Sequence, residues 1–132
     1  MGRTLMVLDT CALLWWTLEP ERLSPLAASM CAAIPKSGAM ISSISLWEVG
    51  VKIKRGKLDI GMEWRRYFDL VTEIGELTIV PVTERIWREN LELEWDHGDP
   101  ADRTIVATAR LYDDALLTAD QDMRAFYPKC RW

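Results

Sequence analysis

Four short apolar runs alternate along this chain with longer stretches in which apolar residues recur at helical spacing. The runs cover residues 5–8, 39–41, 77–80 and 115–118. Runs of this length, with little polar alternation, are typical of strands that are buried on both faces of a parallel sheet. Their alternation with helices predicts the α/β class, and within it an α/β/α sandwich in which helices cover both faces of a central parallel sheet. Residues 129–132 are a candidate edge strand.

The helical stretches carry their own start and stop signals. A hydroxyl or carboxylate residue in front of an apolar stripe is the usual N-cap, and a proline directly after it strengthens the assignment. N-caps are therefore expected at Thr10, Ser24, Thr83 and Asp99. Ser45 and Glu48 have the spacing of a capping box, which predicts that a helix opens at Ser45 and ends at Gly56.

Length and composition are those of one globular domain. The chain has 132 residues, of which 49% are hydrophobic and 27% charged, so residues 1–132 are expected to form a single domain with its own core. No stretch approaches the roughly 18 uncharged apolar residues that a membrane-spanning helix needs. Asp9 interrupts the apolar residues near the N-terminus, which argues against a signal peptide and favours a cytoplasmic protein.

The net charge and the cysteines argue against two kinds of site. A net charge of −4 is atypical of a protein that binds nucleic acid through bulk electrostatic attraction. With one histidine and three cysteines at irregular spacing, the chain lacks a zinc-binding pattern. Cys11 and Cys31 are instead expected to be small core residues of a protein in a reducing compartment.

Several acidic residues stand at points that a parallel sheet would bring together. Asp9 and Asp120 come just after predicted strands. Glu48 and Asp102 lie in the first turns of predicted helices. In an α/β sheet such strand ends and helix starts share one rim, where ligands bind. Each acid taken singly also has a structural interpretation, as a helix cap, a capping-box partner or a turn residue.

Gathering these carboxylates requires compensation. Two unit negative charges ~5 Å apart repel by roughly 3 kcal/mol at an effective dielectric near ~20. A hard divalent cation such as Mg²⁺ or Mn²⁺ prefers oxygen ligands, offsets that repulsion, activates a water and neutralises a phosphodiester. The sequence therefore predicts a catalytic and metal-binding site in which the cation lets an acidic protein act on a polyanion, made of Asp9, Glu48, Asp102 and Asp120.

These acids lie in motifs that resemble, in order, those of PIN-domain nucleases. The first, LDTCALLW at residues 8–15, is similar to the opening motif of that family. The second resembles that of the VapC-type toxin branch and reads ISLWEV at residues 44–49, running on to KRGKL at 54–58. The third reads HGDPADRTIVATA at 97–109, and the fourth LTAD at 117–120. The resemblance covers essentially the whole chain.

The resemblance implies a specific fold, activity and set of partners. It implies a PIN-like sheet in the order 3-2-1-4-5, with Asp9, Glu48 and Asp102 on the family's metal-binding acids and Asp120 on its more variable fourth position. The implied activity is that of an Mg²⁺- or Mn²⁺-dependent endoribonuclease, the toxin of a toxin–antitoxin pair. The implied partners are an RNA substrate, a VapB-type antitoxin and a second copy of the chain. Trp15, Trp16 and Trp47 are equally well explained as residues of an interface with the antitoxin or as residues of the core.

The same sequence features also fit other interpretations. A receiver or phosphotransfer domain also has an aspartate after its first strand, but it needs either a second acid two residues on, where this chain has Cys11, or an acidic pair earlier in the chain. A PIN-like binding module without activity would keep the fold, although all four acids are present. His97, in a Gly-Asp-Pro turn, is more typical of a loop or hydrogen-bonding residue than of a general base. Asp99 is expected to be a helix cap, and Arg103 either orients a carboxylate or touches phosphate.

Overall fold

Five short strands form one parallel sheet at the centre of the computed structural model, which describes residues 5–132. They are β1 (Met6–Leu8), β2 (Ala39–Ser42), β3 (Leu77–Val80), β4 (Ala115–Leu117) and β5 (Cys130–Arg131). Their order is β3-β2-β1-β4-β5, and every pairing is parallel. This arrangement confirms the predicted sandwich class, the order 3-2-1-4-5 and the edge strand near the C-terminus.

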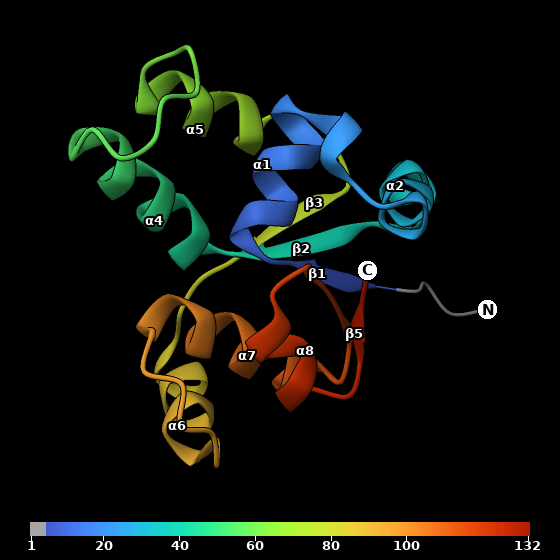
Figure 1. Ribbon diagram of the computed structural model, residues 1–132, viewed down its shortest axis with the longest axis vertical. Coiled ribbons are helices and arrows are strands. Elements are labelled where there is room, and N and C mark those ends of the chain that lie inside the picture. The colour runs from blue at the N-terminus through green and yellow to red at the C-terminus, as the bar shows by residue number, and fades with distance from the viewer. Residues whose placement is uncertain (1–4) are drawn as a thin grey trace.

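Helices cover both faces of the sheet, as Figure 1 shows. One face carries α1 (Thr10–Leu18), α2 (Pro25–Ala32), α3 (Ile34–Ser37), α4 (Ser43–Lys54) and α5 (Trp64–Thr72), with the short 3-10 helix η1 (Pro20–Arg22) after α1. The opposite face carries α6 (Glu84–Glu92), α7 (Pro100–Tyr112) and α8 (Gln121–Phe126). Within residues 5–132, none of the helices combines the length and the apolar character that crossing a bilayer requires.

The strands are apolar throughout because each face of the sheet has its own core. Successive strand residues point to opposite faces. Leu8 and Leu117 therefore pack with the α1 side, whereas Val7 and Leu116 pack with the α7 side. All four of these side chains are fully buried. Burial on both faces explains why the strands read as short uninterrupted apolar runs.

The chain reverses direction across the sheet next to β1. From β1 it proceeds through β2 to β3, and it then returns over the sheet to form β4 on the other side of β1. The amide of Asp9 donates to the carbonyl of Leu117 at 3.1 Å, which joins the carboxyl ends of β1 and β4. In sheets of this type the ligand site lies at such a reversal point. The topology therefore directs attention to the residues that follow these two strands.

The starts of two helices differ from the sequence-based expectation. The N-cap of α1 is Asp9 instead of Thr10, because the Asp9 carboxylate accepts from the amide of Ala12 at 2.7 Å. The capping box predicted at Ser45 is wrong: α4 begins at Ser43, directly after β2, and its N-cap is Ser42. The other expected caps are confirmed, at Ser24, Thr83 and Asp99.

Two further features near the strand ends were not expected. Cys11 is exposed, which contradicts its assignment to the core, because it lies in the first turn of α1, where a surface pocket opens at the end of the sheet. Cys31 is buried, as predicted. Residues 121–126 form α8, whose N-cap is Asp120. This helix is too short to show an amphipathic period in the sequence.

Candidate active site

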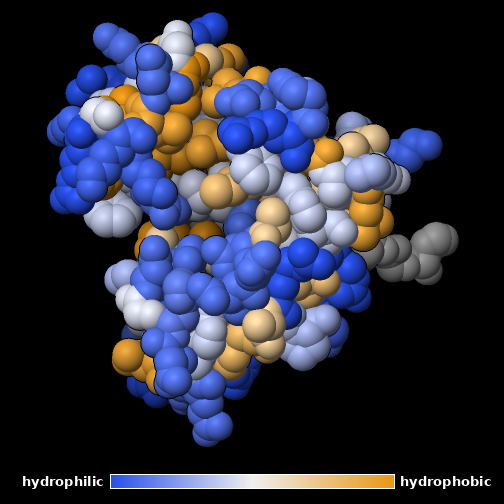
Figure 2. All heavy atoms as spheres, in the orientation of Figure 1, coloured by the Kyte–Doolittle hydropathy of each residue, from blue (hydrophilic) through white to orange (hydrophobic). Residues whose placement is uncertain are grey.

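The four predicted acids line a single pocket at the carboxyl edge of the sheet, which we call the acid pocket. Its volume is about 360 Å³. Its walls come from α1 and α4 on one side and from α7 and the segment before α8 on the other. The space-filling view shows the surface indented between these two halves of the molecule (Figure 2). The lining residues are Asp9, Thr10, Cys11, Trp15, Glu48, Lys52, Asp99, Asp102, Ala119 and Asp120.

Asp9 is the most deeply buried of these acids, with 5% of its surface exposed. One carboxylate oxygen accepts from the amide of Ala12 and the other from the hydroxyl of Thr118. The pKa of Asp9 is raised from 3.8 to about 6, chiefly by burial; the charges of Asp102 and Asp120 add to the rise, and the two hydrogen bonds oppose it. The surroundings of Asp9 in the folded protein therefore disfavour the ionised form of its side chain.

Thr118 is a site residue that sequence reasoning missed. Its hydroxyl donates to the Asp9 carboxylate and accepts from the amide of Asp120 at 3.0 Å, so one fully buried side chain links two of the acids. Thr118 ends the apolar run that predicts a strand over residues 115–118, whereas β4 ends one residue earlier, at Leu117. The signal in the sequence was the position of Thr118, a hydroxyl residue at the end of an otherwise apolar run.

Glu48 reaches the pocket from α4. Its Oε2 forms an ion pair with Lys52 Nζ at 3.3 Å. Its Oε1 is buried and, among the residues that the structure describes, is the one buried side-chain nitrogen or oxygen without a hydrogen-bond partner. An unpaired buried carboxylate oxygen is unfavourable, so this atom is a natural position for a bound cation.

Asp102 lies in the first turn of α7 and is oriented by His97. The ring Nε2 of His97 lies 2.8 Å from Asp102 Oδ2. Burial raises the pKa of Asp102, and repulsion from Asp99, Asp120 and Glu48 adds to this. The hydrogen bond with Asp102 raises the pKa of His97. His97 is thus a hydrogen-bonding loop residue, as predicted, and its partner is one of the predicted metal ligands.

Arg103 holds the loop that carries His97. Its guanidinium donates to backbone carbonyls of residues 90, 93, 95 and 97. It also donates to the side-chain oxygen of Asn90. The ring of Trp95 stacks between those of His97 and Phe126, at centroid distances of 4.7 and 4.8 Å. Arg103 therefore contacts neither a carboxylate nor the pocket directly: it fixes the segment between α6 and α7.

Besides Asp9, two more acids of the acid pocket cap helices. The carboxylate of Asp99 accepts from the amides of Ala101 and Asp102, at the start of α7. That of Asp120 accepts from the amide of Met123 at 2.9 Å, at the start of α8. Helix N-termini stabilise nearby negative charge, which helps these acids to share one pocket. The structural and functional interpretations of these residues are thus compatible.

The acidic side chains provide the kind of ligand atoms that a hard divalent cation prefers, but they are not arranged around a single point in this structure. Across residues 5–132, no three acidic, histidine or cysteine side chains are gathered closely enough to hold one ion. Instead, protein donors engage Asp9, Glu48, Asp102 and Asp120 separately. The donor set nevertheless consists of oxygens, it includes the unpaired Oε1 of Glu48, and burial already disfavours the charge on Asp9. These features fit Mg²⁺ or Mn²⁺.

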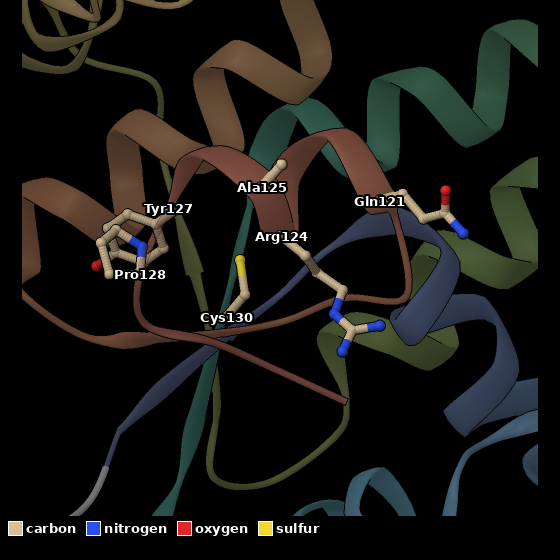
Figure 3. Close-up of a pocket in the computed structure, with 6 residues that line it drawn as sticks. All are labelled: Gln121, Arg124, Ala125, Tyr127, Pro128 and Cys130. Atoms are coloured by element: carbon tan, nitrogen blue, oxygen red, sulfur yellow. The ribbon is translucent and has the colours of Figure 1, made fainter.

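A second pocket lies beside α8, as the close-up shows (Figure 3). Its walls come from α8 and from the segment that leads into β5, with Gln121, Arg124 and Cys130 among the lining residues. Arg124 is the one charged residue that lines it, and no carboxylate does. A site of this composition lacks the ligands that a divalent cation prefers. The acid pocket is therefore the candidate active site.

A parallel sheet with acids at its reversal point places the chain among α/β proteins that bind ligands at the carboxyl edge. Comparison with known proteins identifies the group more closely. The PIN domain family matches residues 6–128, so this chain belongs to the PIN domain family. The predicted family is thereby confirmed.

Individual proteins resemble the chain in sequence or in fold. The chain is 29% identical over 124 residues to Ribonuclease VapC22 of Mycobacterium tuberculosis, and the alignment covers 92% of each chain. A toxin-antitoxin complex from Klebsiella pneumoniae contains a chain of similar fold, with a TM-score of 0.65, 24% identity and 96% coverage of both chains. VapBC2 from Rickettsia felis, bound to a DNA fragment from its promoter, gives a TM-score of 0.67 at 14% identity, with 93% of both chains covered.

Proposed function

We propose that this protein is a metal-dependent endoribonuclease and the toxin of a toxin–antitoxin pair. The observation that carries the proposal is the convergence of Asp9, Glu48, Asp102 and Asp120 on one pocket, from positions spread over most of the chain. Membership of the PIN domain family and similarity to a protein named as a VapC ribonuclease support it. A cytoplasmic location is part of the same proposal.

The four acids would hold Mg²⁺ or Mn²⁺, which when bound supplies an activated water and neutralises charge on the phosphodiester. The chain itself does the positioning. Thr118 and the amide of Ala12 fix the two oxygens of Asp9, and His97 fixes one oxygen of Asp102. Because these partners are buried or braced, the carboxylates keep their orientation when the substrate enters.

Cleavage of RNA is the direct test. The purified protein is expected to cut RNA from a total-RNA preparation when Mn²⁺ is present and to leave it intact when the metal is chelated. Mapping the new ends identifies the target and shows whether cuts are internal. A protein that binds RNA with Mn²⁺ but never cleaves it would support the rival interpretation, a PIN-like binding module without activity.

Binding of the metal should also stabilise the fold. A ligand at about 100 times its Kd stabilises the folded state by roughly 2.7 kcal/mol, which corresponds to a rise in Tm of roughly 10 °C for a chain of this size. The measurement is a thermal melt with and without Mn²⁺. Glu48→Gln is expected to reduce the rise, whereas Asp69→Asn, which removes an exposed acid on α5, should retain it. An unchanged Tm of the wild type at millimolar Mn²⁺ would count against the site.

The partner protein in this proposal is a VapB-type antitoxin. Support comes from a groove between α1 and the segment after α4, which is lined by Leu14, Trp15, Leu18, Glu19, Arg22, Leu58, Asp59 and Ile60. Trp15 also lines the acid pocket, so a chain bound in the groove would reach the entrance to the site. Figure 2 shows apolar residues gathered on this half of the molecule.

Self-association is the remaining part of the proposal. Trp47 is 63% exposed on α4, and Trp87 and Leu91 on α6 are also exposed. Large exposed apolar side chains are typical of surfaces that a partner covers. Trp15 and Trp16 are partly buried, which is compatible both with packing in the core and with contact with a partner. A homodimer remains a prediction, which sedimentation of the purified protein tests.

A further inference from the structure

Lys52 is the one basic side chain among the described residues that line the acid pocket. It lies on α4 one turn after Glu48, and its Nζ is 3.3 Å from Glu48 Oε2. The Lys52 side chain is 50% exposed, whereas that of Glu48 is 15% exposed. The ammonium group therefore reaches from the solvent to a carboxylate inside the pocket, and the proposed function assigns it no role.

Because of the position of Lys52, its ammonium group and a bound divalent cation would compete for the Glu48 carboxylate. Like charges that share a carboxylate repel each other, so an ammonium on Glu48 weakens the binding of a divalent cation there, and the cation weakens the ion pair. Only Oε2 of Glu48 is engaged by Lys52, while Oε1 has no partner. Glu48 can thus accept a cation at Oε1 before it releases the ammonium.

The released ammonium would face a pocket with a large excess of negative charge. Five acids line the acid pocket against this single base. A phosphodiester that enters such a pocket is repelled by every acid that the divalent cation does not neutralise. A lysine has the charge and the flexible stem to follow a phosphate oxygen. Half exposure and a position at the pocket wall give Lys52 access to both its carboxylate and an incoming strand.

We propose that Lys52 is a phosphate-binding residue that occupies Glu48 until a divalent cation displaces it and then contacts the phosphodiester backbone of the RNA. This inference rests on the proposed function. It predicts opposite effects of removing the ammonium: the cation binds more tightly, while the RNA is bound and cut less well. A lysine with only a structural role in α4 would not produce this pair of effects.

The first measurement is metal binding without RNA. Lys52→Met is expected to bind Mn²⁺ roughly 5- to 10-fold more tightly than the wild type, because removal of one charge near the cation reduces its repulsion. The EPR signal of free Mn²⁺ reports this affinity directly. The matched control is Lys54→Met, which removes the same charge two residues on from an exposed side chain that does not line the pocket. It should bind Mn²⁺ within about 2-fold of the wild type.

The second measurement is RNA cleavage at saturating Mn²⁺. Lys52→Met is expected to lower kcat/KM by about 10- to 100-fold, mainly through a higher KM, because a charge-assisted contact to phosphate is lost. Lys52→Arg keeps the charge and should retain most of the cleavage, as well as an Mn²⁺ affinity close to that of the wild type. Melting curves of all variants show whether each is folded.

Each outcome decides something. Lys52→Met with unchanged or weaker Mn²⁺ affinity, or with cleavage equal to that of the wild type, overturns the inference and leaves the proposed nuclease intact. If the wild-type protein itself fails to cut RNA with Mn²⁺, the proposed function fails and the inference with it. Tighter Mn²⁺ binding together with a raised KM supports the assignment.

Discussion

Asp9→Asn is expected to abolish RNA cleavage, by at least about 10³-fold, and to make the metal-free protein more stable. The gain follows from the pKa of Asp9, which burial raises from 3.8 to about 6. At pH 7 the folded protein must hold this carboxylate charged, which is unfavourable by about 3 kcal/mol relative to the unfolded chain. Asparagine removes that charge at nearly the same volume.

The hydrogen bonds around Asp9 allow the substitution. An asparagine oxygen can still accept from the amide of Ala12. Its NH₂ group can donate to the hydroxyl of Thr118, which then donates to the sulfur of Met123, 3.5 Å away. A rise of about 1–3 kcal/mol in the free energy of unfolding is therefore expected at pH 7.

The pH dependence gives this prediction a definite sign. A carboxyl whose pKa is higher in the folded than in the unfolded state binds a proton on folding, so its contribution favours the folded state at low pH. The metal-free wild type should lose about 3 kcal/mol of stability from this group as the pH rises from about 4 through the folded pKa of about 6, and Asp9→Asn should not. Urea denaturation at several pH values measures both curves.

A growth assay complements the denaturation experiment. Expression of the wild-type chain alone is expected to slow growth, and Asp9→Asn to relieve that effect, because the variant folds but does not cleave. Asp69→Asn, on the exposed side of α5, should behave as the wild type in both assays. A marked drop in the Tm of metal-free Asp9→Asn would show that Asp9 is chiefly a structural cap of α1.

Arg103→Met should destabilise the protein by about 3–5 kcal/mol, which corresponds to a fall in Tm of roughly 10–20 °C. The guanidinium donates to the carbonyls of residues 90, 93, 95 and 97, and its removal leaves these acceptors without their donor. Arg103→Lys should recover only part of the loss, because an ammonium cannot span the same fork of acceptors. Thermal melts in the absence of metal measure the effect.

Loss of Arg103 is also expected to reduce cleavage, by about 10-fold at a temperature where the variant is folded, because His97 would no longer be held against Asp102. Arg110→Met is the matched control on the same helix. Arg110 pairs with Glu89 at 2.7 Å near the surface, and its loss should change stability by less than about 1 kcal/mol. If Arg103→Met melts within 2–3 °C (about the change expected of Arg110→Met), the loop is held by other contacts.

The fold could be predicted in outline because its signals are local. Apolar runs mark the strands, and proline or hydroxyl residues mark helices such as those that begin after Ser24 and Asp99. The helix starts that were misplaced lie where a strand passes into a helix without a linker, as at Asp9 and Ser42. There, a second polar residue close by offers an alternative cap, Thr10 beside Asp9 and Ser45 three residues after Ser42, and only backbone geometry selects one.

The four acids were predicted because strand ends and helix starts share a rim in any sheet of this type, and the structure does place them around one pocket. Their surroundings could not be predicted. Thr118 and Asp9 are 109 residues apart in the chain, and Thr10 and Ser45 are 35 apart, yet each pair is joined by a hydrogen bond. No local pattern encodes such contacts.

The sequence alone thus determined the layers, the strand order through its family resemblance, and which acids approach one another, since these depend on periodicity and on topology. Only the tertiary structure decided what each acid contacts: a hydroxyl for Asp9, a histidine ring for Asp102 and an ammonium for Glu48. The physical reason is that hydrogen bonds act over about 3 Å, so they depend on side-chain positions that packing sets after the chain has folded.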